Sequence, residues 1–278
     1  MLFDTHLHLI YPERLSYPWL ADFEVLNKPN RFEDYTRQAK RLGIGGCLHM
    51  EVDVAPDLIR AETGLVDEMI QAPESLMKGA ISSCRPEADD FPAFLEWAKA
   101  QSAIKGFRRV LHVVPDELSQ SGTFRDNVKR LSGTGLTFDL CALPAQLPLM
   151  AELVDHCPDV QFVLDHCGVP AIAAGEMSPW QEHIAALAER PNVIAKISGV
   201  IAYADQESWS LDDIRPWVDF TANAFGPDRL VWGSDSPVCN LGGGLETWVA
   251  VTRALTADWS GAERDALYHG TACRIWGL

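Results

Sequence analysis

Short apolar or β-branched runs recur along the chain at intervals of about thirty residues, and they predict eight β-strands. The runs cover residues 2–9, 44–52, 76–84, 104–114, 136–143, 160–167, 192–198 and 229–234. Between them, apolar residues at helical spacing predict helices that include 31–42, 91–103, 124–131, 147–156, 180–189 and 211–225. Alternation of strands with helices is typical of parallel sheets with right-handed crossovers. We therefore expect an α/β fold.

Eight strand–helix units in 278 residues match a single (β/α)₈ barrel of the TIM type, while a doubly wound open sheet gives the same local pattern. The barrel is favoured because polar residues end nearly every predicted strand: His8, Glu51, Arg108, Asp139, His166, Lys196 and Asp235. A barrel gathers such residues at one mouth. No Gly- or Pro-rich linker divides the chain, so residues 1–278 are expected to form one domain, with residues 11–30 folding over the mouth as a lid.

Composition narrows the classes of partner. The chain is 47% apolar and 22% charged, which is enough apolar sequence to bury a sizeable core. Its 39 acidic and 23 basic residues give a net charge of −16, which argues against binding to nucleic acid or to an anionic membrane surface. A small molecule is the expected partner, and the sequence does not indicate an oligomeric state.

Cellular location is predicted from what the sequence lacks. No apolar segment reaches the length of about 18 residues that a membrane span needs, and the first residues do not have the pattern of a signal peptide. Seven cysteines show no Cys-x-x-Cys spacing, which is typical of reduced, structural thiols. We expect a cytoplasmic protein.

The candidate chemistry begins with His6 and His8 on the first predicted strand. Residues at i and i+2 of a strand share a face, so the two imidazoles point together and can hold a metal ion or a carbonyl oxygen. Strand histidines at this spacing also occur as ordinary half-buried side chains, so the pair alone leaves both interpretations open.

Asp235 and His166 add to this pair. Asp235 ends the eighth predicted strand, which adjoins the first strand in a closed barrel, and a carboxylate there can ligate a metal or take a proton from water. The alternative is a turn aspartate before Pro237. His166 ends the sixth strand at a Gly- and Pro-containing turn, where a purely space-filling histidine is unusual. Glu51 is a further candidate ligand, with a solvated strand-end glutamate as the alternative.

Substrate contacts are expected from five side chains near the predicted mouth: Arg108, Arg109, Trp19, Lys196 and Ser198. Neighbouring strand residues face opposite ways, so only one of Arg108 and Arg109 should reach the pocket. Lys196 and Ser198 share a face and can hydrogen-bond ring oxygens, with a buried ion pair as the alternative for the lysine. Trp19 either stacks on a sugar or packs as part of the lid.

Five motifs in order give the chain a family resemblance. They are the strand-one pair followed by Tyr17-Pro18-Trp19-Leu20, then Asp139-Leu140-Cys141, Asp165-His166-Cys167-Gly168-Val169-Pro170, Lys196-Ile197-Ser198-Gly199 and Gly233-Ser234-Asp235-Ser236-Pro237. With them the chain resembles the amidohydrolase superfamily, of the amidohydrolase 2 type. Within it, the chain is similar to a sugar-lactonase branch that includes L-fuconolactonase, L-rhamnonolactonase and a pyrone-dicarboxylate lactonase. The resemblance implies a distorted barrel that hydrolyses a sugar-derived lactone to a hydroxy acid.

The chain also departs from the wider superfamily. Many members have a histidine at the end of strand five and a bridging lysine or glutamate on strand four, whereas this chain has Asp139 and Cys141 on strand five and Arg108 and Arg109 on strand four. The resemblance therefore implies one divalent ion, with zinc preferred, or none. His6, His8 and His166, or one ion held by His6, His8, Asp235 and Glu51, would polarise the lactone carbonyl, and Asp235 would act as general base. A metal-dependent decarboxylase of the same superfamily and a non-catalytic ligand-binding barrel are the alternatives.

Overall fold

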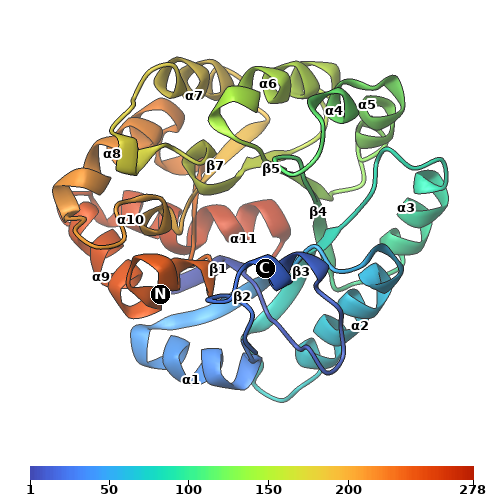
Figure 1. The fold of residues 1–278 in the computed structure, drawn as a ribbon, viewed down its shortest axis with the longest axis horizontal. Helices are drawn as coiled ribbons and strands as arrows, with labels where there is room; N and C mark the ends of the chain where they lie inside the picture. Colours follow the sequence, from blue (N-terminus) through green and yellow to red (C-terminus); the bar gives the residue numbers. More distant parts are fainter.

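The computed structural model describes residues 1–278, and its central feature is a barrel of eight parallel strands (Figure 1). The strands are β1 (Leu2–Leu7), β2 (Ile44–Met50), β3 (Met77–Ser83), β4 (Ile104–Val110), β5 (Thr137–Cys141), β6 (Phe162–Leu164), β7 (Val193–Ser198) and β8 (Leu230–Gly233). They neighbour one another in chain order. Each of the eight predicted runs contains one of them, so the barrel prediction is confirmed and the open sheet is wrong.

The barrel closes unevenly between β8 and β1. Strands β1 to β8 are joined by continuous ladders, whereas the seam is closed just beyond β8 by a bridge between Leu7 and Ser236. The backbone N–H of Asp235 donates to the carbonyl of His6 at 2.8 Å, and the N–H of His8 donates to the carbonyl of Ser236 at 2.8 Å. The segment that carries Asp235 is thereby paired directly with the segment that carries the two histidines.

Helices surround the strands (Figure 1). They are α1 (Phe32–Leu42), α2 (Ile59–Ile70), α3 (Phe91–Lys99), α4 (Asp116–Gln120), α5 (Gly122–Lys129), α6 (Leu147–His156), α7 (Trp180–Ala188), α8 (Leu211–Phe225), α9 (Gly244–Leu255), α10 (Gly261–Asp265) and α11 (Thr271–Trp276). Five of the six helical stretches predicted from the sequence contain a helix, and the sixth, 124–131, overlaps α5. In α1, Glu33 and Asp34 occupy the first turn and Lys40 and Arg41 the last, in the sense that the helix dipole favours, and Gly43 ends the helix at φ 80°.

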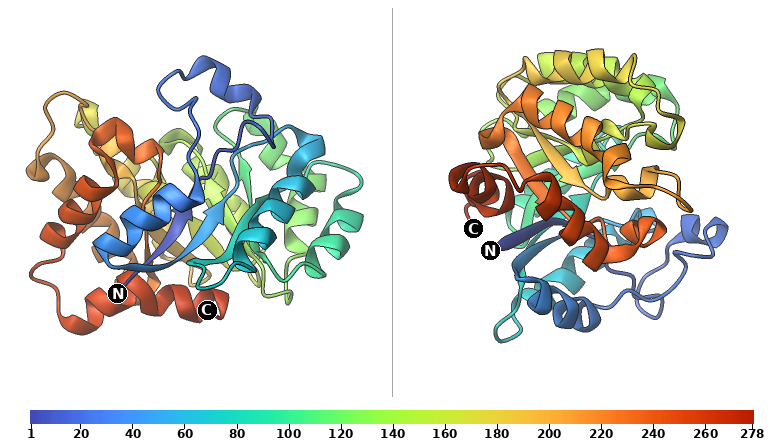
Figure 2. Two further views of the ribbon diagram at one scale, coloured as in Figure 1. Left: turned by 90° about the horizontal axis from the view of Figure 1, so that it is seen from below. Right: turned by 90° about the vertical axis from the view of Figure 1, so that its left-hand side faces the viewer.

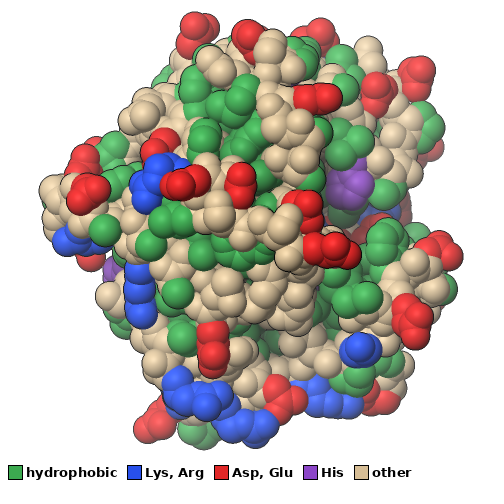
Figure 3. Space-filling model, turned by 60° about the vertical axis from the view of Figure 1, so that its left-hand side comes forward, with side chains coloured by type: hydrophobic (Ala, Val, Ile, Leu, Met, Phe, Trp, Pro, Cys, Tyr) green, Lys and Arg blue, Asp and Glu red, His purple; other side chains and the backbone are tan.

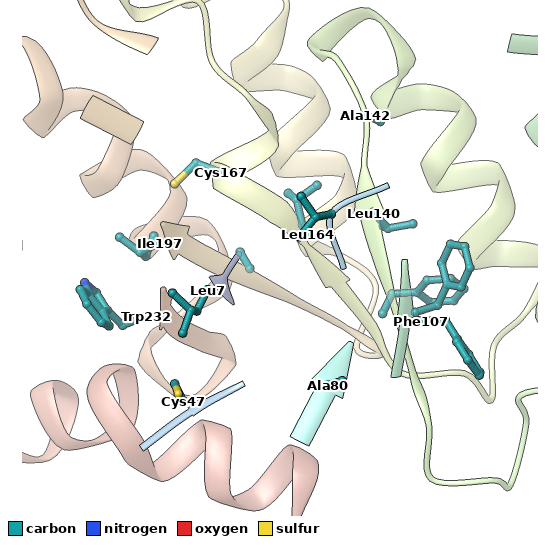
Figure 4. Packing of buried hydrophobic residues seen from close by; sticks show 14 of the residues in the cluster. Leu7, Cys47, Ala80, Phe107, Leu140, Ala142, Leu164, Cys167, Ile197 and Trp232 are labelled. Carbon is teal, nitrogen blue, oxygen red and sulfur yellow. The ribbon is translucent and has the colours of Figure 1, made fainter. Parts of the chain in front are cut away.

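Two apolar layers position the strands. The outer layer lies between the barrel and its helices, and Figure 4 shows side chains that each strand contributes to it, including Leu7, Phe107, Leu164, Ile197 and Trp232. The inner layer fills one end of the barrel. We call this inner cluster the floor, and it consists of Phe3, Leu48, Met50, Ile81, Val163, Ile194, Val231, Ala272 and Trp276. Because α11 supplies its last two members, the end of the chain plugs the barrel.

Residues 11–30 lie at the opposite end of the molecule from α11, as Figure 2 shows on the left, with this segment in dark blue and the C-terminal helices in red. The segment contains a short 3₁₀ turn (Pro18–Asp22), and its ends are joined by a bridge between Ile10 and Asn30. The indole N–H of Trp19 donates to the carbonyl of Val52 at 2.8 Å, which fastens the segment to the chain just beyond β2. This placement agrees with the expected lid.

The surface agrees with the composition. Acidic side chains are spread over the face drawn in Figure 3. None of the helices is long and apolar enough to cross a bilayer. All seven cysteines are free, and six of them are buried.

Candidate active site

His6 and His8 lie together at the mouth of the barrel. Their Nε2 atoms are 3.1 Å apart, and both residues are buried. The Nδ1 atom of His8 lies 3.1 Å from the carbonyl oxygen of Met50 and 3.0 Å from that of Glu51. Because a carbonyl only accepts, His8 carries its proton on Nδ1, and its Nε2 lone pair faces His6. Burial lowers the pKa of His8 to about 3, so the ring is neutral at pH 7.

Asp235 completes this group from the other side of the seam. Its Oδ1 atom lies 3.4 Å from Nε2 of His8 and 3.7 Å from Nε2 of His6. Its Oδ2 atom is buried without a hydrogen-bond partner. Burial raises the pKa of Asp235 to about 6. The residue also has a positive φ of 57°, a conformation that favours glycine and that the paired seam imposes.

These three residues fit one divalent ion. A tetrahedral zinc site with ligands at about 2.0–2.1 Å places neighbouring donor atoms about 3.3 Å apart. The separations among the two Nε2 atoms and Oδ1 of Asp235 are 3.1, 3.4 and 3.7 Å. The Nδ1–H of His8 is fixed by backbone carbonyls, which is the second-shell arrangement usual for a metal-ligating histidine. The three donor atoms therefore have the spacing of a mononuclear site.

His166 lies on a strained turn at the end of β6. A 3₁₀ turn (Asp165–Gly168) replaces the strand, with φ of 51° at His166 and 53° at Cys167. Such backbone is costly for residues with side chains and is found at functional sites. The hydroxyl of Ser198 lies 2.9 Å from Nδ1 of His166, which is itself 3.7 Å from Oδ2 of Asp235. The ring packs against that of His6 with centroids 4.4 Å apart.

A buried ionic network supports the three histidines. Nζ of Lys196 lies 2.7 Å from Oδ2 of Asp139, 2.9 Å from Oδ1 of Asp165 and 3.2 Å from Nδ1 of His6. These contacts match the three ammonium protons of Lys196, which is fully buried, so none is left for a substrate. The structure therefore places Lys196 in the buried ion pair that was its alternative interpretation.

Arg108 forms the second half of this network. It donates from Nε to Glu51 at 2.6 Å and from Nη2 to the Glu51 carbonyl at 3.0 Å. The other carboxylate oxygen of Glu51 accepts from the N–H of Asp53 at 2.7 Å. Glu51 is thus fully buried and has a partner on each oxygen, which contradicts a solvated strand-end glutamate, while its role as a metal ligand stays a prediction.

The charges at the mouth do not balance. Its buried ionic side chains comprise two cations and four carboxylates, which give a net charge of −2 when all are ionised: Arg108, Lys196, Glu51, Asp139, Asp165 and Asp235. Burial lowers the pKa values of His6 and His166, so the imidazoles add no positive charge at pH 7. A divalent cation would neutralise the group.

The remaining predicted contacts lie farther from this cluster. Arg109 faces away from Arg108 and pairs with Glu87 at 2.9 Å, which decides which of the two arginines points into the barrel. Trp19 is held against the chain beyond β2, as described above. Ser198 lies inside the barrel and orients His166. Their roles toward a substrate stay predictions.

Sequence reasoning gave no role to Asp165 or Tyr203, which the structure brings to the site. Asp165 contacts His6, Lys196 and Arg108, and the ring of Tyr203 lies 6.0 Å from that of His166, centroid to centroid. A signal existed for Asp165. It follows Val163 of the floor by two residues, so strand alternation carries it onto the inward face. No comparable periodicity marks Tyr203, which follows the end of β7.

Comparison with known proteins places this arrangement in a family. The family model described as "Amidohydrolase" matches residues 3–278. L-fucono-1,5-lactonase of Burkholderia multivorans is 29% identical, over 99% of this chain and 95% of that protein. The 4-sulfomuconolactone hydrolase of Rhizobium radiobacter is 25% identical, over 84% of this chain and 75% of that protein.

A solved structure agrees with these relatives. A crystal structure of an amidohydrolase from Burkholderia multivorans with bound zinc has a TM-score of 0.89 and 25% identity, and the match covers 100% of this chain and 99% of that one. Lactonase relatives support hydrolase activity and lactone hydrolysis at the level of the family. With a family model that matches nearly its whole length, the chain belongs to the amidohydrolase family.

Proposed function

We propose that the protein hydrolyses a sugar-derived lactone, an aldono-1,4- or 1,5-lactone, to the open hydroxy acid. The observation that carries the proposal is the Asp235 carboxylate, which is buried beside three neutral imidazoles and has one oxygen without a partner. A carboxylate with a raised pKa is suited to accept a proton from water and return it within one catalytic cycle. The named lactonases among the relatives support the choice of a lactone as substrate.

The first step is attack by water. The lactone carbonyl oxygen approaches Nε2 of His6, on the side where it faces the mouth beside Nε2 of His8. Oδ2 of Asp235 accepts a proton as the water oxygen bonds to the carbonyl carbon, and negative charge develops on the carbonyl oxygen. A preorganised donor that faces this oxygen stabilises the charge, typically by about 3 kcal/mol.

Ring opening completes the cycle. The bond between the carbonyl carbon and the ring oxygen breaks, and Asp235 returns its proton to the leaving alkoxide. His166, held by Ser198 and facing Oδ2 of Asp235, keeps that carboxylate oriented toward the mouth. The products are a hydroxyl and a carboxylic acid on one chain, and the acid then releases its proton to solvent.

A single divalent ion fits this site through His6, His8 and Asp235, and when bound it would polarise the lactone carbonyl. Zinc is the first candidate because a similar structure contains it. We expect at most one ion per chain, because Lys196 and Arg108 occupy the space beside the remaining carboxylates. Two tightly bound equivalents in elemental analysis would contradict this expectation.

A panel of aldonolactones tests the proposal, with acid release followed by a pH indicator. Amides and phosphate esters are assayed alongside at the same protein concentration. We expect turnover of at least one lactone above that of any amide or phosphate ester. Cleavage of an amide or a phosphate ester without lactone turnover would refute the proposal.

A further inference from the structure

The proton positions on the histidines at the mouth follow from the fixed acceptors around them. Nδ1 of His8 faces two backbone carbonyls, so it is the protonated nitrogen of that neutral ring, as argued above. Its Nε2 is therefore an acceptor. The contact of 3.1 Å between the two Nε2 atoms then requires the proton on Nε2 of His6. Neutral His6 consequently has its lone pair on Nδ1.

Lys196 is the donor for that lone pair. Its Nζ lies 3.2 Å from Nδ1 of His6. Asp165 also lies close, with Oδ1 at 3.4 Å from the same nitrogen, and this oxygen pairs with Nζ of Lys196 at the shorter distance of 2.9 Å. The shortest contact at each end of the His6 ring, with His8 at 3.1 Å and with Lys196 at 3.2 Å, thus gives the same tautomer. Nη1 of Arg108 also approaches Nε2 of His6, at 3.4 Å. This contact is longer than the 2.6 Å hydrogen bond that Arg108 donates to Glu51.

These bonds form a continuous chain. The ammonium of Lys196 donates to His6, His6 donates to His8, and His8 donates to the Glu51 carbonyl. Lys196 is held in place by Asp139 and Asp165, and the side chains of Lys196, His6 and both aspartates are fully buried. Water therefore does not compete for the ammonium protons.

We propose that Lys196 is a positioning residue that fixes His6 as the tautomer with its proton on Nε2. In this form His6 can transfer its hydrogen bond from His8 to an incoming carbonyl oxygen, so the site can polarise a carbonyl with its own residues. The same bond opposes metal binding. Ligation through Nε2 requires the His6 proton to move to Nδ1, where it would face the ammonium of Lys196.

The proposal rests on the proposed function only in naming a carbonyl oxygen as the group that His6 would bind. Its test uses no substrate. Metal-free protein labelled with nitrogen-15 histidine is studied by NMR, which distinguishes protonated from unprotonated ring nitrogens. His6 signals are assigned with a His6→Gln sample. We expect the proton of His6 on Nε2 in the wild-type protein. A His6 proton on Nδ1 in the wild-type protein would overturn the proposal, whether or not the lactone assay succeeds.

Lys196→Met then removes the donor and retains similar bulk. We expect the His6 proton to shift toward Nδ1 and the zinc Kd, measured by competition with a chelating dye, to fall at least tenfold. Asp139→Asn is the matched control, because it alters a partner of Lys196 that does not contact His6, and its His6 tautomer should match the wild type. If Lys196→Met does not fold, the double variant with Asp139→Asn reduces the unpaired buried charge. An unchanged tautomer and zinc Kd in a folded Lys196 variant would refute the proposal.

Discussion

The two ends of the barrel interior are lined by the same strands and differ completely in chemistry. At the floor, Val163, Ile194 and Val231 pack against Trp276 without a charged group. Two residues farther along β7, and just beyond β6, Lys196 and Asp165 form a buried ion pair at the mouth. The difference indicates a division of roles between the two ends. Apolar packing at the floor fixes the strands, and the other ends of the same strands hold buried charges that are costly for stability. Stability and chemistry should therefore respond to separate substitutions.

Asp235→Asn should have the largest effect, and this effect should be on catalysis at the mouth rather than on stability. An amide cannot accept the proton, and loss of general-base assistance lowers kcat by about 10²–10⁴-fold. The thermal midpoint should stay close to that of the wild type, because Asn is nearly isosteric. Both quantities are measured on one preparation, with the exposed Asp159→Asn as the control.

A turn aspartate with no catalytic role would behave differently. It would give a modest loss of stability with near-normal turnover. A folded Asp235→Asn variant that retained more than about a tenth of the wild-type kcat would be incompatible with the base role.

Trp276→Ala should have the opposite pattern at the floor. Truncating a buried tryptophan typically lowers the free energy of unfolding by about 3–5 kcal/mol, and here it also removes the 3.2 Å hydrogen bond from the indole to Thr137. Denaturant unfolding measures the loss, and kcat is assayed at a temperature where the variant is folded. A large fall in kcat of the folded variant would show that the two ends are not independent.

Ser198→Ala tests a finer feature of the mouth. The hydroxyl orients His166 through a 2.9 Å hydrogen bond, and losing such a bond typically costs about 0.5–1.5 kcal/mol. We expect kcat/KM to fall by up to about tenfold. Ser82→Ala on β3 is the matched control, since that hydroxyl is also buried but pairs with Thr63 at 3.2 Å. Equal effects of the two substitutions on kcat/KM would contradict a specific role for Ser198.

The last prediction concerns the pH dependence of stability. Burial raises the pKa of Asp139 to about 7, against about 3.9 for an unfolded aspartate. A group with a raised pKa contributes stability that is fully present below pH 3.9 and is lost as the pH rises through 7. Its contribution changes by at most about 1.4 kcal/mol per pH unit.

Asp139→Asn removes this titration, so the thermal midpoint of the variant should fall less between pH 5 and pH 8 than that of the wild type. The exposed Asp159→Asn again serves as the control. A variant whose midpoint fell as steeply as that of the wild type would show that Asp139 does not titrate in this range.

Strand alternation made much of the site predictable. On β7, Ile194, Lys196 and Ser198 share the inward face, and Val231 and Asp235 follow the same spacing at β8. The first strand breaks this rule. Phe3 belongs to the floor, yet His6 and His8 reach the mouth, because the register shifts between Asp4 and Leu7. A single sequence does not reveal such a shift.

Other features depended on tertiary contacts. The positive φ values at His166 and Cys167 follow from packing around the turn, and neither residue type predicts such values. The partners of Glu51 and Lys196 come from strands far apart in sequence, so their burial and ion pairs could not be derived from local pattern. Strand spacing and strand-end position made the histidines and Asp235 candidates, and the family resemblance agreed, but neither gave their protonation.

The seam between β1 and β8 makes the mouth dependent on nearly the whole chain. Oδ1 of Asp4 accepts from the N–H of Ser234 at 2.7 Å across a sequence separation of 230 residues, and the same oxygen accepts from the N–H of His6 at 3.1 Å. During synthesis, His6 and His8 emerge early but meet Asp235 only after β8 has been translated and docked. Catalytic competence would therefore appear late, as an all-or-none property of the completed barrel, and partly synthesised chains would be inert toward substrate.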